Sequence, residues 1–313
     1  MQTTRFVLNQ HPVHWDRFGL KICLTAFGLL AGNAAFAQQP PSTVFRSALL
    51  ETSAASYSYS SAADLTSGGA VIGGVSVHHA ELSLSGRRTL TPGLQLAYGL
   101  AYEVNLLDAS AATPLPDQLA GLSLNFGLIH PVDARWNTAV FVRPGFYSDF
   151  KTLGVRSFNV PVLFTASYTP RRELTWTFAV SVNTFSKNTV LPVIGAHWQF
   201  APDWDFEVGF PRTALTWRTG EMLKLRISAE FQGGSYRVTR EPPAAVVPAL
   251  AGSLLDYREI RTGGGLECRL SKTISLATDT GIVVDRRFDY HERNYRMDGR
   301  TAGYLKLSLN RRF

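Results

Sequence analysis

Residues 303–313, GYLKLSLNRRF, form an alternating segment that stops on an aromatic residue. Leu305, Leu307, Leu309 and Phe313 fall on one face, and Arg311 departs from the apolar pattern of that face. Side chains of a β-strand alternate with a period of two, so the segment reads as a strand with one apolar side. An unpaired edge strand of this kind is a liability, whereas a closed barrel pairs its last strand with its first. The segment therefore predicts a closed β-barrel.

Other segments repeat the alternation over lengths that suit a membrane crossing. Residues 94–106 place Leu, Tyr and Val side chains on one face and Gln, Ala, Gly, Glu and Asn on the other. Residues 122–128 and 174–182 repeat the pattern. A typical strand has about five or six residues, and a tilted transmembrane strand needs about 9–11. Small and polar residues on the second face are what the lumen of a membrane barrel requires.

The amino-terminal region has the features of a secretory leader. Arg5, Arg17 and Lys21 precede a short apolar run at 22–30, and Ala35-Phe36-Ala37 forms an A-x-A cleavage signal. The run is shorter than the roughly 20 residues that a transmembrane helix needs. We predict a cleaved signal peptide at 1–37, a periplasmic segment at 38–52 and a transmembrane barrel at 53–313, and an uncleaved anchor is the alternative for the leader.

Turn signals alternate with longer connections, which orients the predicted strands. Tight turns are expected at 89–92, 131–135, 170–172, 201–203, near Gly220 and at 271–272. Longer loops are expected at 64–74, 108–117, 149–155, 186–189, 211–213, 239–255 and 286–301. Such barrels place tight turns in the periplasm and longer loops outside. These connections predict an all-β, closed antiparallel barrel of 14 strands, with 12 as the alternative because Pro211 divides two short segments.

One group of charged residues is predicted to face the lumen. It contains Lys224, Arg226, Glu230, Glu259, Arg261, Glu267 and Arg269 on two strands joined by the 239–255 loop, and Asp279 on the next. Opposite charges on neighbouring strands can pair. The cluster is either a structural set of ion pairs or a selectivity device of a pore. The balance of signs favours the structural interpretation, because unpaired buried charges are costly. Arg143, Asp205 and Glu207 are further lumen candidates.

The two longest predicted loops differ in chemistry. Residues 241–255 are rich in Pro, Val and Leu, so this loop is expected to fold inward as a plug, cover the mouth, contact an apolar ligand or pack on neighbouring loops. Residues 285–300 mix Arg with Asp and Glu in nearly equal numbers. That composition favours a solvated loop that pairs with itself, with lipopolysaccharide phosphate as the alternative partner.

The sequence carries no recognisable catalytic or cofactor motif. It has no G-x-S-x-G elbow, phosphate-binding loop, H-E-x-x-H or C-x-x-C. Of the two cysteines, Cys23 lies in the predicted leader, so a mature chain would have no internal disulfide. We predict no enzymatic activity, no cofactor and no metal site. A membrane-embedded hydrolase is retained only as a third hypothesis, on the basis of single histidines such as His197.

Taken together, the leader, the alternation and Phe313 resemble an uncharacterised outer-membrane β-barrel family of Gram-negative bacteria. The resemblance implies a bacterial outer-membrane location, contact with lipid and lipopolysaccharide, and recognition of the last strand by the barrel assembly machinery. The leading functional hypothesis is a pore or transporter for a small solute, and a closed structural or adhesive barrel is the alternative. No nucleic-acid partner is expected.

Overall fold

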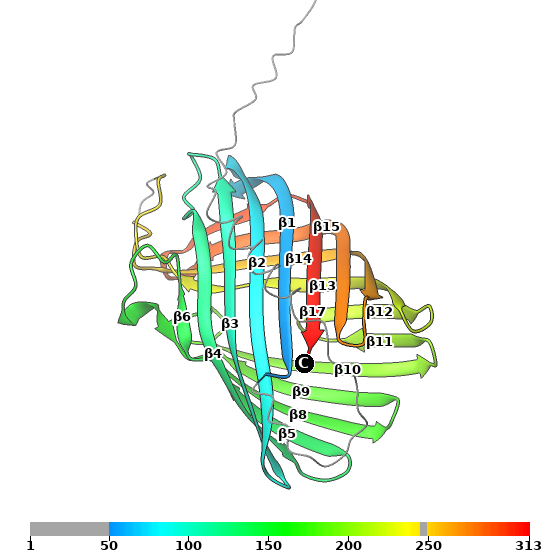
Figure 1. The fold of residues 1–313 in the computed structure, drawn as a ribbon. Coiled ribbons are helices and arrows are strands. Elements are labelled where there is room, and N and C mark those ends of the chain that lie inside the picture. Colours follow the sequence, from blue (N-terminus) through cyan, green and yellow to red (C-terminus); the bar gives the residue numbers. More distant parts are fainter. Residues whose placement is uncertain (1–49, 245–248) are drawn as a thin grey trace, which may run out of the picture. The chain divides into compact units, whose positions relative to one another are not determined.

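The chain folds into a closed β-barrel. The computed structural model describes residues 50–244 and 249–313; the predicted leader lies outside them, as does most of the predicted 38–52 segment. Seventeen strand segments form one sheet, and β1 (Thr52–Ser67) pairs antiparallel with β17 (Ala302–Arg312), which closes the wall (Figure 1). Three of the strands are each interrupted once, so the segments amount to 14 strands. The predicted number is confirmed over the alternative of 12.

The first half of the wall contains long strands and two interrupted ones. In order these are β1, β2 (Ala70–Thr91), β3 (Leu94–Ala109), β4 (Gln118–Pro131), β5 (Trp136–Val142) with β6 (Gly145–Ser148), and β7 (Phe158–Asn159) with β8 (Val162–Arg171). A short 3-10 helix, η1 (Val155–Ser157), precedes β7. Pro144 and Pro161 lie at the two interruptions. Proline has no N–H to donate to a neighbouring strand, which explains why pairing stops there.

The second half of the wall includes the two short segments on either side of Pro211, which the sequence did not clearly identify as strands. It comprises β9 (Leu174–Val182), β10 (Val190–Ala201), β11 (Trp204–Val208), β12 (Arg212–Arg218), β13 (Leu223–Arg237), β14 (Leu254–Arg269), β15 (Ile274–Tyr290), and β16 (Tyr295–Gly299) with β17. Strands β11 and β12 flank Pro211 and pair with each other from Trp204↔Trp217 to Glu207↔Ala214. Both are therefore strands of the wall, although they are short.

The barrel has two different ends. The described ends of the chain and the connections 92–93, 132–135, 172–173, 202–203, 219–222 and 270–273 lie at one end, called the turn end here. The connections 68–69, 110–117, 149–157, 183–189, 209–211, 238–253 and 291–294 lie at the other, the loop end. At the turn end, Asp133 accepts backbone N–H groups of Arg135 (2.7 Å) and Trp136 (2.8 Å), and these bonds lower the pKa of its carboxyl group.

The outer surface of the barrel is apolar along much of its height. Exposed side chains on this surface include Ile194 (60%), Ile227 (70%) and Leu305 (50%). Tryptophans 136, 176, 198, 204 and 217 all lie within a few residues of turn-end connections. Trp204 stacks on Trp217 with 5.8 Å between ring centroids. No described helix is long and apolar enough to span a bilayer.

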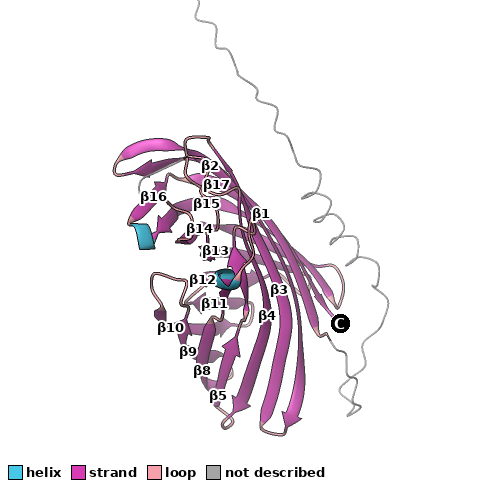
Figure 2. Ribbon diagram, turned by 90° about the vertical axis from the view of Figure 1, so that its left-hand side faces the viewer, coloured by secondary structure: helices cyan, strands magenta, loops and turns pink. Residues whose placement is uncertain are grey.

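The predicted loop at 286–301 is wrong. Strand β15 continues to Tyr290, a single 3-10 turn η2 (His291–Arg293) follows, and β16 returns beside β15 (Figure 2). Arg286, Phe288 and Tyr290 are fully buried on one face. The fully buried side chains of this segment occur at every second position, but the many charged residues make the alternation hard to recognise in the sequence. The segment does pair with itself as expected, because Asp298 forms ion pairs with both Arg287 and Arg296.

Candidate functional site in the barrel interior

Neighbouring strands bring most of the predicted lumen charges into pairs. Lys224 and Glu267 occupy directly opposed positions on β13 and β14, with 3.0 Å between Nζ and Oε1. Glu230 pairs with Lys306 of β17 at 2.6 Å. Of the predicted cluster, Arg269 is exposed near the turn end and has no ion-pair partner among the described residues.

A glycine lets one ion pair cross an intervening strand. Arg226 on β13 contacts Asp279 on β15 at 2.5 Å. The position opposite Arg226 on β14 is Gly265, and a Cβ atom there would lie 2.0 Å from Oδ1 of Asp279. Any larger residue at this position would therefore displace the Asp279 carboxylate. The absence of a side chain leaves room for the guanidinium and carboxylate to meet above β14.

Three charged side chains form a fully buried layer farther from the turn end. Glu259 binds Arg261 (Oε2–Nη2, 2.7 Å) and Arg286 (Oε1–Nε, 2.7 Å), and the three side chains are 0–1% exposed. Arg261 also donates to the hydroxyl groups of Ser58 and Ser60 on β1. Burial of charge is tolerated only when pairing and hydrogen bonding are nearly complete. This layer meets that requirement with groups drawn from three strands.

Beside this layer, opposite walls of the barrel touch each other. Tyr236 of β13 donates to Glu103 of β3 at 2.8 Å and accepts a hydrogen bond from Asn105 at 3.2 Å. At the next position of β13, Arg237 forms a parallel bridge with Ser148 of β6. These strands are distant in the order around the wall, so the contacts cross the interior. The barrel is narrowed near its loop end.

An apolar cap fills the loop end above the buried layer. Its members are Leu65, Val75, Val77, Leu107, Leu115, Leu119, Tyr236, Val238, Leu250, Leu255, Tyr257, Phe288, Tyr290 and Met297. The 238–253 loop contributes Val238 and Leu250, both fully buried. Carboxylates hold the loop backbone: Asp149 accepts from Thr239, and Glu241 accepts from the N–H of Leu250. Packing against neighbouring residues at the loop end was one of the alternatives expected for this loop from its apolar composition.

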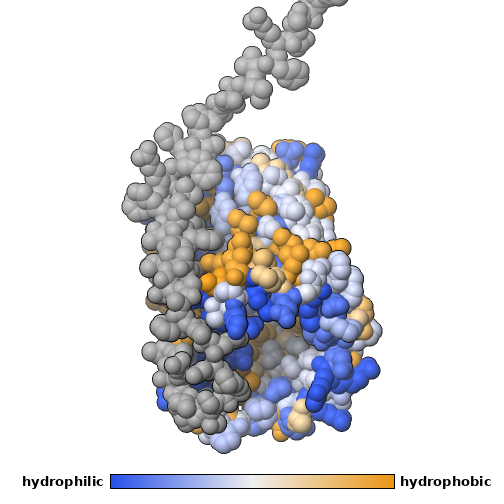
Figure 3. Space-filling model, turned by 45° about the vertical axis from the view of Figure 1, so that its right-hand side comes forward, coloured by the Kyte–Doolittle hydropathy of each residue, from blue (hydrophilic) through white to orange (hydrophobic). Residues whose placement is uncertain are grey.

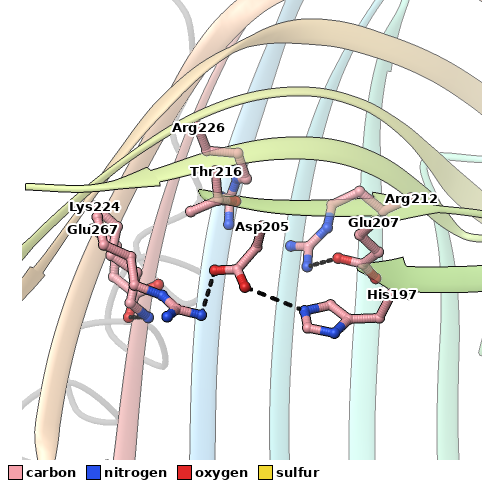
Figure 4. Close-up of a pocket in the computed structure, with 9 residues that line it drawn as sticks. His197, Asp205, Glu207, Arg212, Thr216, Lys224, Arg226 and Glu267 are labelled. Atoms are coloured by element: carbon pink, nitrogen blue, oxygen red, sulfur yellow. Dashed lines mark hydrogen bonds and ion pairs between the residues drawn. The ribbon is translucent and has the colours of Figure 1, made fainter. Parts of the chain in front are cut away.

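On the turn-end side of the buried layer, the interior is hollow and polar. One cavity of about 200 Å³ is lined by His197, Asp205, Glu207, Arg212, Thr216, Arg218, Lys224, Arg226 and Glu267 (Figure 4). A second, of about 310 Å³, is lined by residues of β1, β2, β12, β13, β14, β15 and β17, including Glu81, Asp279 and Lys306. Arg212, Arg226 and Glu267 line both. Figure 3 shows a hollowed face surrounded by hydrophilic side chains.

Strands β10–β12 add charged groups that lie close together in the first cavity. Asp205 contacts Arg218 and lies 3.7 Å from His197, and Glu207 pairs with Arg212 at 2.8 Å. In the described ranges, no group of three or more His, Cys, Asp or Glu side chains is arranged to hold a metal ion.

Sequence reasoning placed Asp205, Glu207 and Glu230 in the lumen but missed their partners Arg218, Arg212 and Lys306. For Lys306 the alternation was an available signal, since it falls between Leu305 and Leu307. Arg212 and Arg218 have no such signal, because each lies at an end of the short strand next to Pro211 and is followed by a threonine. Arg286 was missed because its segment was interpreted as a loop.

A family model for a domain of unknown function (DUF6268) matches residues 97–309. A search of curated proteins finds no match. Among solved structures, an outer membrane channel from Pseudomonas putida F1 is similar at 13% identity, covering 88% of this chain and 100% of that one, with a TM-score of 0.47. A Ralstonia pickettii toluene transporter (7% identity, 84% and 90% coverage, TM-score 0.40) and a Pseudomonas aeruginosa FadL homologue (9%, 84% and 90%, 0.36) are also similar.

Proposed function

This chain belongs to the DUF6268 family, and we propose that it is an outer-membrane channel for small polar solutes. The observation that carries the proposal is the combination of a closed barrel, an apolar exterior and a charged, hollow interior on the turn-end side of the buried layer. An apolar exterior suits lipid, whereas charged groups around a cavity suit water and polar solutes.

The tryptophans and the connection lengths give the proposal an orientation. Tryptophan concentrates at membrane–water interfaces, because its ring is apolar and its N–H is polar, and all five described tryptophans lie near the turn end. The short connections of this end assign it to the periplasmic interface, because outer-membrane barrels place tight turns there. The loop end then faces outward, where lipopolysaccharide is the expected neighbour. We further propose that the barrel assembly machinery recognises the strand that ends at Phe313.

The apolar cap supplies the proposed gate. The cap and the Glu259 layer fill the interior at the loop end, so a solute passes only if the 238–253 loop moves and the side chains of the remaining cap and of the Glu259 layer rearrange. Part of this loop is held by hydrogen bonds from its backbone to Asp149 and Glu241 rather than by continuous strand pairing. Its displacement would expose Val238 and Leu250 without breaking the wall of the barrel.

A closed structural or adhesive barrel is the second candidate. The fully buried layer and cap favour it, because both resemble a permanent core. The two candidates differ in one property: the channel conducts once its cap is displaced, and the structural barrel does not.

Single-channel recording in planar bilayers distinguishes them. One variant replaces residues 240–251 with a short Gly-Ser linker and retains β13 and β14. A matched control replaces the exposed residues Ala111 and Ala112 of another loop-end connection with Gly-Ser. The channel proposal expects brief openings in wild type, longer openings in the 240–251 variant and wild-type behaviour in the control. If neither the correctly folded wild type nor the 240–251 variant conducts, the channel is refuted and the structural barrel is favoured.

A further inference from the structure

We propose that the cavity wall formed by β12 and β13 is a binding site for the carboxylate group of a small organic anion. The site consists of Arg212, Thr216 and Arg226, and it rests on the proposed channel function, for which it names the class of solute. The argument depends on where the cations lie, which donors they have left and which space they line.

Four cations that line the first cavity lie on two neighbouring strands, Arg212 and Arg218 on β12 and Lys224 and Arg226 on β13. Across the β12–β13 pairing, Arg218 is directly opposite Lys224 and Thr216 is directly opposite Arg226. Like charges at opposed positions are unfavourable. An ion-pair ladder built only for stability would alternate the signs across this pairing. Here the sign alternates at one position only, where Arg212 is opposite Glu230, and the acids that pair with Arg212, Arg218, Lys224 and Arg226 lie on β11, β14 and β15.

Because the acids flank the basic group, they leave donors unused. In the described part of the chain, Arg212 meets one carboxylate, that of Glu207, and Arg226 meets one, that of Asp279; both contacts are made through Nη2. Nη1 of each arginine has no hydrogen-bond or ion-pair partner among the described residues, whereas Nε is buried without an acceptor and is not available to a solute. A guanidinium has five N–H donors in a planar fork that matches a carboxylate. Each arginine can therefore keep its acid and bind a further acceptor.

Arg212 and Arg226 also lie at the boundary between the two cavities of the interior. Both line the cavity of about 200 Å³ and the cavity of about 310 Å³, so they lie where the two spaces meet. Figure 4 shows both arginines among the residues that line the first cavity. Thr216 lines the first cavity between them and supplies a hydroxyl group. A solute that moves between the two cavities would pass these donors. This arrangement selects for an anion with a planar, bidentate head group.

Isothermal titration calorimetry of the refolded full chain in detergent tests the site without requiring conduction. The probe is succinate, and its uncharged counterpart is succinamide. We expect saturable binding of succinate and none of succinamide. The test variant is Arg226→Gln with Asp279→Asn, which removes donors without changing net charge. We expect at least about ten-fold weaker succinate binding, since charge-assisted bidentate bonds are the strong ones.

Two further variants separate a binding site from a general effect of charge. Arg226→Lys keeps the positive charge but loses the planar fork, and several-fold weaker binding is expected because lysine binds as a point charge. Arg258→Gln with Asp285→Asn removes a pair of similar length (2.9 Å) outside the cavities, and an affinity within about two-fold of wild type is expected. Retention of the folded state is checked by heat-modifiable migration in gels.

The possible results are distinct. Absence of succinate binding in the folded wild type would overturn the site, as would equal binding by wild type and the Arg226→Gln, Asp279→Asn variant. Tighter binding of inorganic phosphate than of succinate would overturn the carboxylate assignment. Binding with the expected pattern in a barrel that never conducts would retain the site and reject the channel, so the two proposals fail separately.

Discussion

Replacement of Glu259 by glutamine is expected to destabilise the barrel more than any surface charge substitution. Glutamine has nearly the same shape, so no cavity is created, but the negative charge is lost. Arg261 and Arg286 would remain buried as two cations without their shared carboxylate. Arginine stays protonated in proteins and cannot relieve the repulsion by losing a proton. Removal of one partner from a buried ion pair costs about 3–5 kcal/mol.

The expected loss of unfolding free energy can be compared with that for a matched, exposed ion pair. Asp298 also accepts from two arginines, Arg287 and Arg296, but its side chain is 41% exposed. Asp298→Asn should therefore cost only about 0–1 kcal/mol, as measured for surface ion pairs. Urea unfolding of the refolded proteins in the same lipid, followed by tryptophan fluorescence, gives both free energies. A loss of less than about 1 kcal/mol for Glu259→Gln would refute the reasoning that the buried layer depends on full charge compensation.

Three other substitutions have definite expectations. Gly265→Ala should destabilise the barrel by about 1–3 kcal/mol in the same unfolding assay, because the new Cβ displaces the Asp279 carboxylate; wild-type stability would contradict the crossing geometry. Tyr236→Phe leaves Glu103 without its 2.8 Å donor and should cost about 1–3 kcal/mol; no measurable loss would mean that the contact across the interior is unimportant. Asp133 has a lowered pKa, so its stabilising effect is present above the ordinary value of 3.8 and disappears as pH falls through the folded value. Asp133→Asn should therefore be less stable than wild type at neutral pH and equal to it in strong acid, and a pH-independent difference in urea midpoints would contradict this.

The wall of the barrel could be predicted from sequence because its signal is local. Alternation in segments such as 94–106 records which side of a strand meets an apolar environment, and turn residues mark where strands end. The same rule failed at 286–301, where arginines and acids outnumber the apolar residues. Phe288 and Tyr290 occupy alternate positions on the buried face of that segment, but the surrounding charged residues make the alternation hard to recognise.

The interior could be predicted only in part because its contacts are not local. Lys224 and Glu267 follow from a simple hairpin between β13 and β14. The hydrogen bonds of Arg261 with Ser58 and of Tyr236 with Glu103 join residues that are 203 and 133 positions apart. Such contacts depend on how the closed wall narrows, and the sequence carries no local signal of them. The gathering of cations on β12 and β13 likewise depends on register, which spacing alone does not determine.

Cysteine accessibility most directly tests the account of a hollow chamber beneath a movable cap. Cys23 and Cys268 are first replaced by alanine, and single cysteines are then introduced at Thr216, which lines the first cavity, or at Val77, which is fully buried in the cap. We predict that a charged thiol reagent modifies Thr216→Cys rapidly in the folded protein in lipid. Val77→Cys should be protected until residues 240–251 are replaced by the linker. Protection of both positions, or equal reaction of both in the intact barrel, would contradict the account.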